Sequence, residues 1–196
     1  TKENLDKKAF LFPVKPALQY VPADPLGLDG TGFQGHNMWA ASNPTFGAVF
    51  SLYIKDEYKT LKDIRQEKEK ALEKEKKDVF YPTFDELRKE ALDEAANLIW
   101  VITDETGKEI RRMTSSPTKG IVRMSWNLRS NSSTSISATS NGFLVKPGNY
   151  FVSISLLQNG LVEELVTKQS FTVIGLNNQT LLAKDPAELV LFRKDV

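Results

Sequence analysis

Alternation of apolar and polar residues is clearest between residues 98 and 173, where it predicts a sheet. In the strand predicted over 121–128, Val122, Met124, Trp126 and Leu128 share one side of a period-two pattern. Trp126 is therefore expected in the core. Turn sequences separate the strand-like runs: DETG at 104–107, PG at 147–148 and NG at 159–160. This pattern predicts a mainly β fold, an antiparallel β-sandwich.

The same alternation marks an earlier strand, AVFSLYIK at 48–55. Ala48, Phe50, Leu52 and Ile54 fall on one side of it, and this side is expected to face the core. It is the first strand that the pattern predicts for the sandwich.

A helical period replaces the alternation after residue 56. Residues 57–78 are dense in Lys and Glu and predict an exposed amphipathic helix. Thr83 and Glu86 form a capping box that starts a second helix, whose buried side is expected to hold Leu87, Ala91 and Ala95. We predict a helical hairpin inserted over 56–97. Two roles are open for it, a strut packed on one sheet, which is favoured, and an interaction surface.

The first 47 residues contain five prolines among apolar residues, which argues against long helices and central strands. We expect an extended segment that lies on other structure. Its Gly-rich part ends in His36, Asn37 and Trp39, which could hydrogen-bond to and stack on a sugar. The favoured alternative is a covering loop, because a phosphate-binding motif is absent from this stretch.

These patterns divide the chain into three parts. Residues 1–47 form the extended Pro/Gly-rich segment packed on the domain, and residues 48–175 form the sandwich with its helical insertion at 56–97. Residues 176–196 form a C-terminal extension, in which Asp185 and Pro186 have the residue types that begin a helix. The sequence begins at Thr1 rather than Met, so we expect it to belong to a longer protein.

Composition narrows the function further. The net charge is +1 with both signs interleaved, which disfavours nucleic acid as a partner, and no apolar run of the sequence is long enough to span a membrane. The sequence has no Cys and one His, so neither a thiolate nucleophile nor a Cys-based metal site is expected. A pair of glycosidase carboxylates is not recognisable either. We expect no cofactor, no metal and no catalysis by this chain.

Several motifs resemble known bacterial modules. The runs DETGKEIRRM, GIVRMSWNLR and VKPGNYFVSI resemble the immunoglobulin-like (Ig-like) module of flagellar hook-capping proteins. The order LFPVKPALQY, GFQGHNMWAASNPTFGAVFSLYIK, Lys/Glu-rich helices and DELRKE resembles the region after the propeller in bacterial BNR/Asp-box, sortilin-like proteins of the glycosyl hydrolase type. An Asp-box motif, S-x-D-x-G-x-x-W, does not occur in this sequence.

The resemblance implies an Ig-like β-sandwich outside the cytoplasm, periplasmic or secreted. It implies a non-catalytic accessory domain that docks on and stabilises the propeller of the same parent chain. Apolar residues of the Pro-rich segment are the expected contacts: Phe10, Phe12, Leu18 and Tyr20. Two alternatives remain, a carbohydrate-binding module that uses His36 to Trp39, and a free-standing hydrolase.

Overall fold

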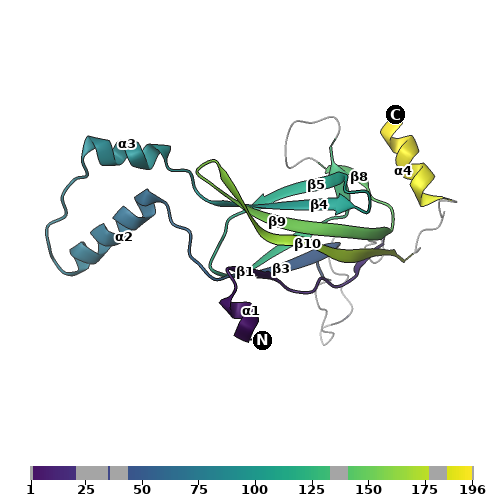
Figure 1. The fold of residues 1–196 in the computed structure, drawn as a ribbon, viewed down its shortest axis with the longest axis horizontal. Helices are drawn as coiled ribbons and strands as arrows, with labels where there is room; N and C mark the ends of the chain where they lie inside the picture. Colours follow the sequence, from purple (N-terminus) through teal and green to yellow (C-terminus); the bar gives the residue numbers. More distant parts are fainter. Residues whose placement is uncertain (1, 21–34, 36–43, 133–140, 177–184, 196) are drawn as a thin grey trace.

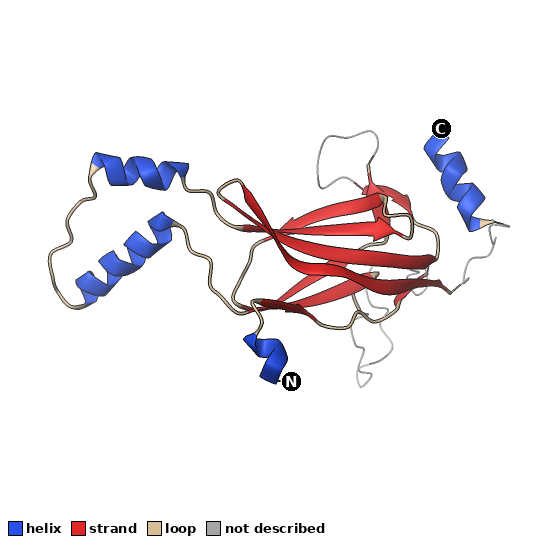
Figure 2. Cartoon of the chain, viewed as in Figure 1, coloured by secondary structure: helices blue, strands red, loops and turns tan. Residues whose placement is uncertain are grey.

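The computed structural model describes residues 2–20, 35, 44–132, 141–176 and 185–195. Two sheets pack face to face into a β-sandwich (Figure 2). The smaller sheet has the order β1-β3-β6, formed by Ala9–Leu11, Ala48–Ile54 and Gly120–Trp126. The larger has the order β2-β10-β9-β4-β5, formed by Ala17–Gln19, Leu161–Gly175, Gly148–Gln158, Asn97–Asp104 and Glu109–Ser115. A ribbon of β7 (Arg129–Asn131) and β8 (Asn141–Leu144) adjoins β5.

The alternating strands take the faces that their patterns predict. Strand β3 is antiparallel to β6, with Phe50 opposite Met124 and Leu52 opposite Val122. All four predicted inward residues of β3 are buried, and so is Trp126. The predicted strand over 121–128 is too long, because β6 ends at Trp126 and Leu128 has a φ of 59°. This turn of the backbone still places the Leu128 side chain in the core.

Aromatic rings join the two sheets across the core. Phe50 of β3 contacts Trp100 of β4 and Phe171 of β10, with ring centroids 6.0 and 5.3 Å apart. Trp126 of β6 contacts Tyr150 of β9 at 5.5 Å. Both indoles are fully buried, and each N–H finds an acceptor as burial requires: Trp100 donates to Ser115 Oγ and Trp126 to the Arg129 carbonyl.

Two further features are typical of Ig-like sandwiches. Trp100 is a fully buried tryptophan on the strand beside β9. The Tyr150 hydroxyl donates to the Lys146 carbonyl at 2.7 Å, which forms a tyrosine corner at the start of β9. Burial raises the pKa of Tyr150 to about 12, so this hydroxyl stays protonated and remains a donor at neutral pH. The predicted Ig-like β-sandwich is confirmed.

The N-terminal segment contributes a strand to each sheet. After helix α1 (Lys2–Asp6), β1 pairs antiparallel with β3, and β2 pairs parallel with β10. The chain crosses from one sheet to the other over 12–16, which holds Pro13 and Pro16. Both strands have three residues and lie at sheet edges, where neighbouring prolines are tolerated. The segment predicted over 1–47 as a layer on the domain is thus partly built into it.

The predicted helical hairpin is present between β3 and β4. Helix α2 spans Leu61–Lys74 and α3 spans Phe84–Leu92, and the pair extends away from one end of the sandwich (Figure 1). The interpretation as a strut packed on a sheet is therefore wrong. Neither helix contains a buried residue: of the predicted buried side, Leu87 is half-buried, whereas Ala91 and Ala95 are exposed. Periodicity predicted the apolar side of α3, but most of that side is exposed.

The turns and the C-terminal helix agree with their sequences. Asn159 and Gly160 have φ values of 49° and 74°, the left-handed conformations that the tight β9–β10 turn requires. Helix α4 spans Pro186–Asp195, and the Ala187 N–H donates to the Asp185 carboxylate at 2.7 Å, as the predicted cap requires. This helix lies beside β8, at the end of the sandwich opposite the hairpin (Figure 1).

Candidate functional site

The base of the hairpin is fastened to the tip of the β9–β10 turn. Asp93, the residue after α3, accepts a hydrogen bond from the Leu61 N–H at 2.7 Å and another from the Asn159 amide at 3.1 Å. The Asn159 side-chain oxygen accepts from the Glu94 N–H at 2.9 Å. Asp93 therefore joins the start of α2, the end of α3 and the sandwich at one point.

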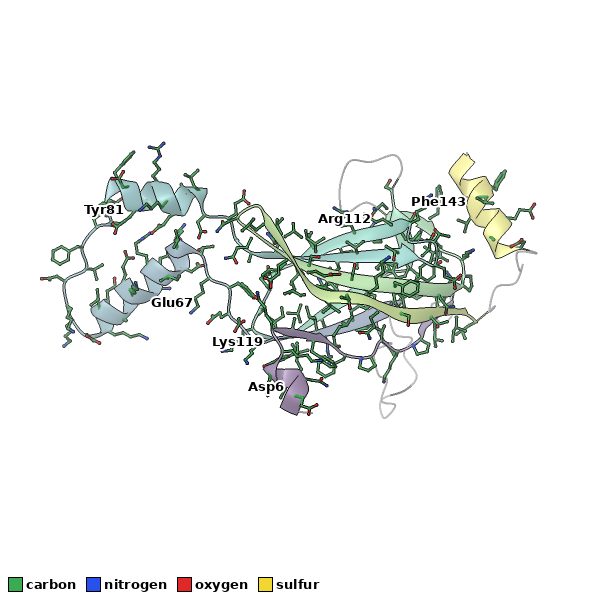
Figure 3. The ribbon with its side chains drawn as sticks, viewed as in Figure 1. Asp6, Glu67, Tyr81, Arg112, Lys119 and Phe143 are labelled. Atoms are coloured by element: carbon green, nitrogen blue, oxygen red, sulfur yellow. The ribbon has the colours of Figure 1, made fainter. Side chains whose placement is uncertain are left out.

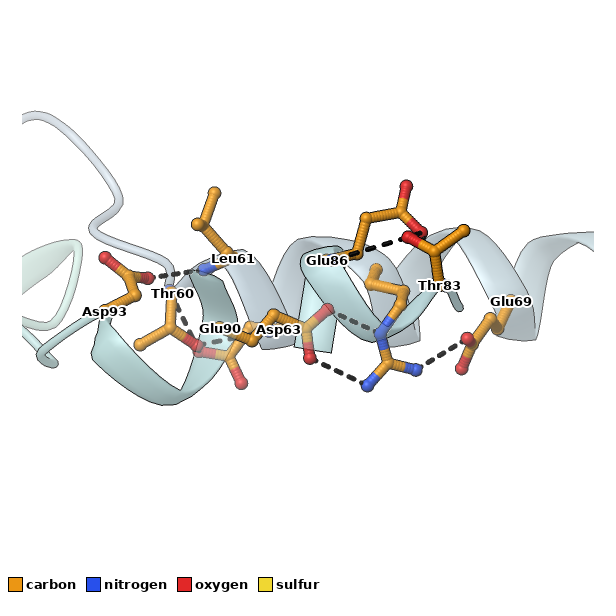
Figure 4. A network of polar contacts seen from close by, with 9 residues as sticks. Thr60, Leu61, Asp63, Glu69, Thr83, Glu86, Glu90 and Asp93 are labelled. Atoms are coloured by element: carbon orange, nitrogen blue, oxygen red, sulfur yellow. Dashed lines mark hydrogen bonds and ion pairs between the residues drawn. The ribbon is translucent and has the colours of Figure 1, made fainter. Parts of the chain in front are cut away.

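An arginine holds the two helices together. Arg65 of α2 donates to both carboxylate oxygens of Glu90 on α3, at 2.6 and 3.0 Å, and to Glu69 at 2.6 Å (Figure 4). The Glu90 side chain is only 10% exposed. The hydrogen bonds from Arg65 hold the pKa of Glu90 below its usual value, so the clamp is charged at neutral pH.

Capping boxes begin both helices. In α2 the Thr60 hydroxyl accepts from the Asp63 N–H while the Asp63 carboxylate accepts from the Thr60 N–H. Thr83 and Glu86 repeat this arrangement in α3, as their sequence predicts (Figure 4). Hydrogen bonds from the Thr60 hydroxyl and N–H lower the pKa of Asp63, and those from the Thr83 N–H and hydroxyl lower that of Glu86. Local polar contacts thus define a hairpin that has no core.

The hairpin exposes large aromatic side chains. Phe80 and Tyr81, in the loop between the helices, are 84% and 87% exposed, and Phe84 at the start of α3 is 81% exposed. Figure 3 shows Tyr81 at the far end of the hairpin from the sandwich. A groove of about 610 Å³ lies between the helices, with Leu61, Leu72 and Val79 among its apolar residues. Exposed aromatic residues on one projecting element mark an interaction surface.

A second apolar patch lies where the N-terminal segment joins the larger sheet. Leu18 of β2 is the register partner of Ile174 on β10, and the two are 44% and 43% exposed. Their strand neighbours Ala17 and Val173 are buried, so Leu18 and Ile174 face outward. Leu176 continues the patch, and its N–H donates to the Gln19 carbonyl. We call Leu18, Ile174 and Leu176 the strap patch.

The predicted contact residues of the N-terminal segment divide into two groups. Phe10 is half-buried and contacts Phe12 edge-on at 5.2 Å, and Tyr20 is half-buried against Phe46 at 5.1 Å. Phe12 and Leu18 are the exposed members of the set. Ile174 and Leu176 were missed, although Ile174 alternates with the core residue Val173 and its outward apolar side chain could have been noticed.

The predicted ligand residues His36, Asn37 and Trp39 lie outside the described residues. Within the described part, no group of three His, Asp or Glu side chains could hold a metal ion. Across that same part, no helix is long and apolar enough to cross a membrane.

Several carboxylates of the described ranges make structural contacts. Glu163 pairs with Lys8 and Glu109 with Arg112. The Asp104 side chain accepts from the Thr106 and Lys108 N–H groups in the β4–β5 turn. Burial alone would raise the pKa of Asp104, but these hydrogen bonds outweigh it and hold the pKa below the usual value. Wherever the pKa of a described carboxyl group is shifted, the shift is downward.

Comparison with known proteins adds no relative. No family model, no curated protein and no solved structure matches this chain.

Proposed function

We propose that this chain is a non-catalytic accessory domain, a rigid Ig-like sandwich that docks on a neighbouring protein domain through the strap patch. The observation that supports this proposal is that Leu18 and Ile174, which are cross-strand neighbours, face outward together and are followed by the exposed Leu176. The outer face of an antiparallel sheet is normally polar where it meets water. Apolar residues clustered on such a face favour burial against another protein.

The resemblance of the sequence makes a β-propeller of a glycosyl hydrolase-like protein the proposed partner. Phe12 and Leu18 belong to the Pro-rich segment that resembles the region after such a propeller, and both are exposed. Leu18 belongs to the strap patch, and the Phe12 carbonyl accepts a hydrogen bond from the Gln169 side chain on β10, the strand that also holds Ile174. On this proposal the domain works outside the cytoplasm, with its parent protein.

The lowered pKa values argue against four of the described carboxyl groups as the acid of a glycosidase. A glycosidase needs one carboxyl group with a raised pKa to act as the acid, across a cleft from a second carboxylate. Hydrogen bonds instead lower the pKa of Asp63, Glu86, Glu90 and Asp104. These groups are charged at neutral pH and cannot donate a proton there.

Binding to a separately produced propeller of the resembled family tests the proposal. Titration calorimetry should give a saturable complex that the Leu18→Asp/Ile174→Asp variant weakens at least about tenfold, because two buried anchors are lost. Val162→Asp is the matched control, since Val162 is 64% exposed on the same strand but outside the strap patch. It should leave the affinity unchanged.

Two results would contradict the proposal. One is equal affinity of the strap-patch variant and wild type. The other is turnover of aryl glycosides by the purified chain that a single Asp or Glu substitution abolishes. Circular dichroism of each variant shows whether the sandwich is folded, so lost binding can be separated from lost structure.

A further inference from the structure

We propose that the open edge of β6 binds an extended, acidic segment of a partner protein, which adds a fourth strand to the smaller sheet. Within the described residues, β6 pairs with β3 and has no strand on its other side. A partner strand can extend such an edge: its main chain supplies hydrogen bonds, and its side chains supply specificity. This edge belongs to the smaller sheet, so it is separate from the strap patch on the larger one.

Hydrogen bonds on the far side of β3 show which of its backbone groups face β6. The Phe12 N–H donates to the Ser51 carbonyl, and the Lys55 N–H donates to the Lys8 carbonyl, both at 3.0 Å. Phe12 and Lys8 flank β1, so both bonds lie on the β1 side of β3. Backbone groups alternate in direction along a strand, and the odd-numbered residues of β3 therefore point toward β1. Its even-numbered residues point toward β6.

The register then identifies the open backbone groups of β6. Even-numbered residues of β3 lie opposite even-numbered residues of β6, as Leu52 lies opposite Val122. These pairs exchange the hydrogen bonds between the two strands, so the odd-numbered residues of β6 direct their N–H and C=O groups outward. They are Ile121, Arg123 and Ser125. No other backbone group of the described residues bonds to them outside the β3–β6 ladder.

Apolar side chains along this edge are incompletely covered. Val122 and Met124 of β6 face the core but are half-buried, whereas Leu52 of the neighbouring β3 is fully buried. Met113 of β5 packs against the core and is half-buried as well. Residues 116–119 join β5 directly to β6, so these two edges lie on the same side of the sandwich. An added strand beside β6 would cover these side chains with its own inward residues.

The charges around β6 favour an acidic strand. Residues 110–162 contain six Lys or Arg and no Asp or Glu. Lys119 and Arg123 are exposed and form no ion pair within the described ranges. A carboxylate on the added strand would be a cross-strand neighbour of Arg123, where opposite charges stabilise pairing. Two β6 edges would instead bring like charges together, which disfavours a second copy of this chain as the partner.

These features define the segment that the edge would bind. Strand β6 has seven residues and no register shift against β3, so it offers a regular template. We expect a segment of similar length in which apolar residues alternate with Asp or Glu. Its apolar residues would lie beside Val122 and Met124, and its carboxylates would lie on the outer face beside Arg123.

Two matched peptides test the chemistry of the site. One alternates valine with glutamate over about nine residues, a usual strand length, and the other has lysine in place of each glutamate. Fluorescence anisotropy with the full chain should show saturable binding of the Val/Glu peptide, at least about tenfold tighter than that of the Val/Lys peptide. Lys119→Glu/Arg123→Glu should reverse this preference. Lys70→Glu/Lys74→Glu makes the same charge change on exposed positions of α2 and should leave the preference unchanged.

A proline substitution tests the backbone pairing. Ser125→Pro removes an outward N–H but no β3–β6 hydrogen bond, a change that edge strands tolerate. It should weaken binding of the Val/Glu peptide at least about tenfold, whereas Ser125→Ala keeps the N–H and should bind like wild type. Circular dichroism shows whether Ser125→Pro is folded. If it is not, the charge-reversed variant decides alone.

Four results would overturn the inference. They are absence of saturable Val/Glu binding by the wild-type chain, equal affinity for the two peptides, an unreversed preference in Lys119→Glu/Arg123→Glu, and wild-type binding by folded Ser125→Pro. Sedimentation velocity adds a further outcome. Self-association of the wild-type chain that Ser125→Pro abolishes would assign the edge to a second copy and would also contradict the inference.

Discussion

The sandwich and the helical hairpin are stabilised by different kinds of interaction. Every residue of the hydrophobic core lies in the sandwich strands or their connections, and α2 and α3 contain no buried residue in the part of the chain that the structure describes. The hairpin is defined instead by two capping boxes, the Arg65–Glu90 clamp and the Asp93 anchor. Burial of apolar side chains stabilises the sandwich, whereas ion pairs and local hydrogen bonds define the hairpin.

This difference bears on function. A sandwich with an interlocked aromatic core is a stable scaffold, and its outer surface can carry a binding patch at little cost in stability. A hairpin without a core keeps its apolar side chains available to a partner, while the clamp and caps limit the conformational entropy lost on binding. The strap patch therefore belongs to a sheet of the sandwich, whereas the exposed aromatic residues Phe80, Tyr81 and Phe84 belong to the projecting hairpin.

The largest effect is expected in the aromatic core. Trp126→Ala should lower the free energy of unfolding by about 3 to 5 kcal/mol, because it leaves a cavity where Trp126 contacts Tyr150 and Phe171. Phe84→Ala, at a concentration where the chain is monomeric, should change it by no more than about 0.5 kcal/mol. Urea unfolding measures both. Similar values for the two substitutions would contradict the contrast between core and hairpin.

Strands in which apolar and polar residues alternate were predictable from the sequence. The side that holds Phe50 and Leu52, and the one that holds Trp126, follow from a period of two because each strand has one buried face. Strands β1 and β2 were not predicted. Three residues are too few to show alternation, and Pro13 and Pro16 suggested that pairing was excluded. Both strands lie at the edges of their sheets, where neighbouring prolines do not prevent pairing.

The candidate surfaces were predictable only in part. Apolar composition identified Phe12 and Leu18, but pairing of β2 with β10 across the whole chain length brings Ile174 beside Leu18. Helical periodicity identified the apolar side of α3 and assigned Ala91 to the buried side. Periodicity reports which side is apolar and contains no information on whether anything covers it. Both the contact of Leu18 with Ile174 and the exposure of Ala91 depend on which distant parts of the chain lie together in the fold.

A smaller, local effect is expected when the pH falls. The pKa of Glu90 and that of Glu86 are lowered from 4.5 in the folded chain, by Arg65 and by the Thr83 cap respectively. A lowered pKa contributes stability that is complete above the ordinary value and is lost as the pH falls through the lowered one. The hairpin should therefore open below pH 4.5, before the sandwich unfolds.

Hydrogen exchange can follow this opening by region. Amides of α3 should lose protection as the pH falls from 4.5 to about pH 3, after correction for intrinsic rates, while amides of β9 keep theirs. Arg65→Ala should cause the same loss in α3 at about pH 6, because Glu90 then lacks its partner. Simultaneous loss of protection in α3 and β9 would show that the two regions unfold as one unit.

The smallest effect is expected from removal of the outer half of α2. Replacing residues 68–77 with a short Gly/Ser linker removes no buried side chain and leaves Arg65, Glu90 and Asp93 in place. The free energy of unfolding of the monomer should change by no more than about 0.5 kcal/mol, within the range of surface substitutions. Urea unfolding should stay a single cooperative transition with an unchanged slope, because the surface exposed by the sandwich on unfolding is the same. Loss of that cooperativity would mean that the hairpin is part of the folding unit, and the charge-based clamp would then be a structural element of the sandwich.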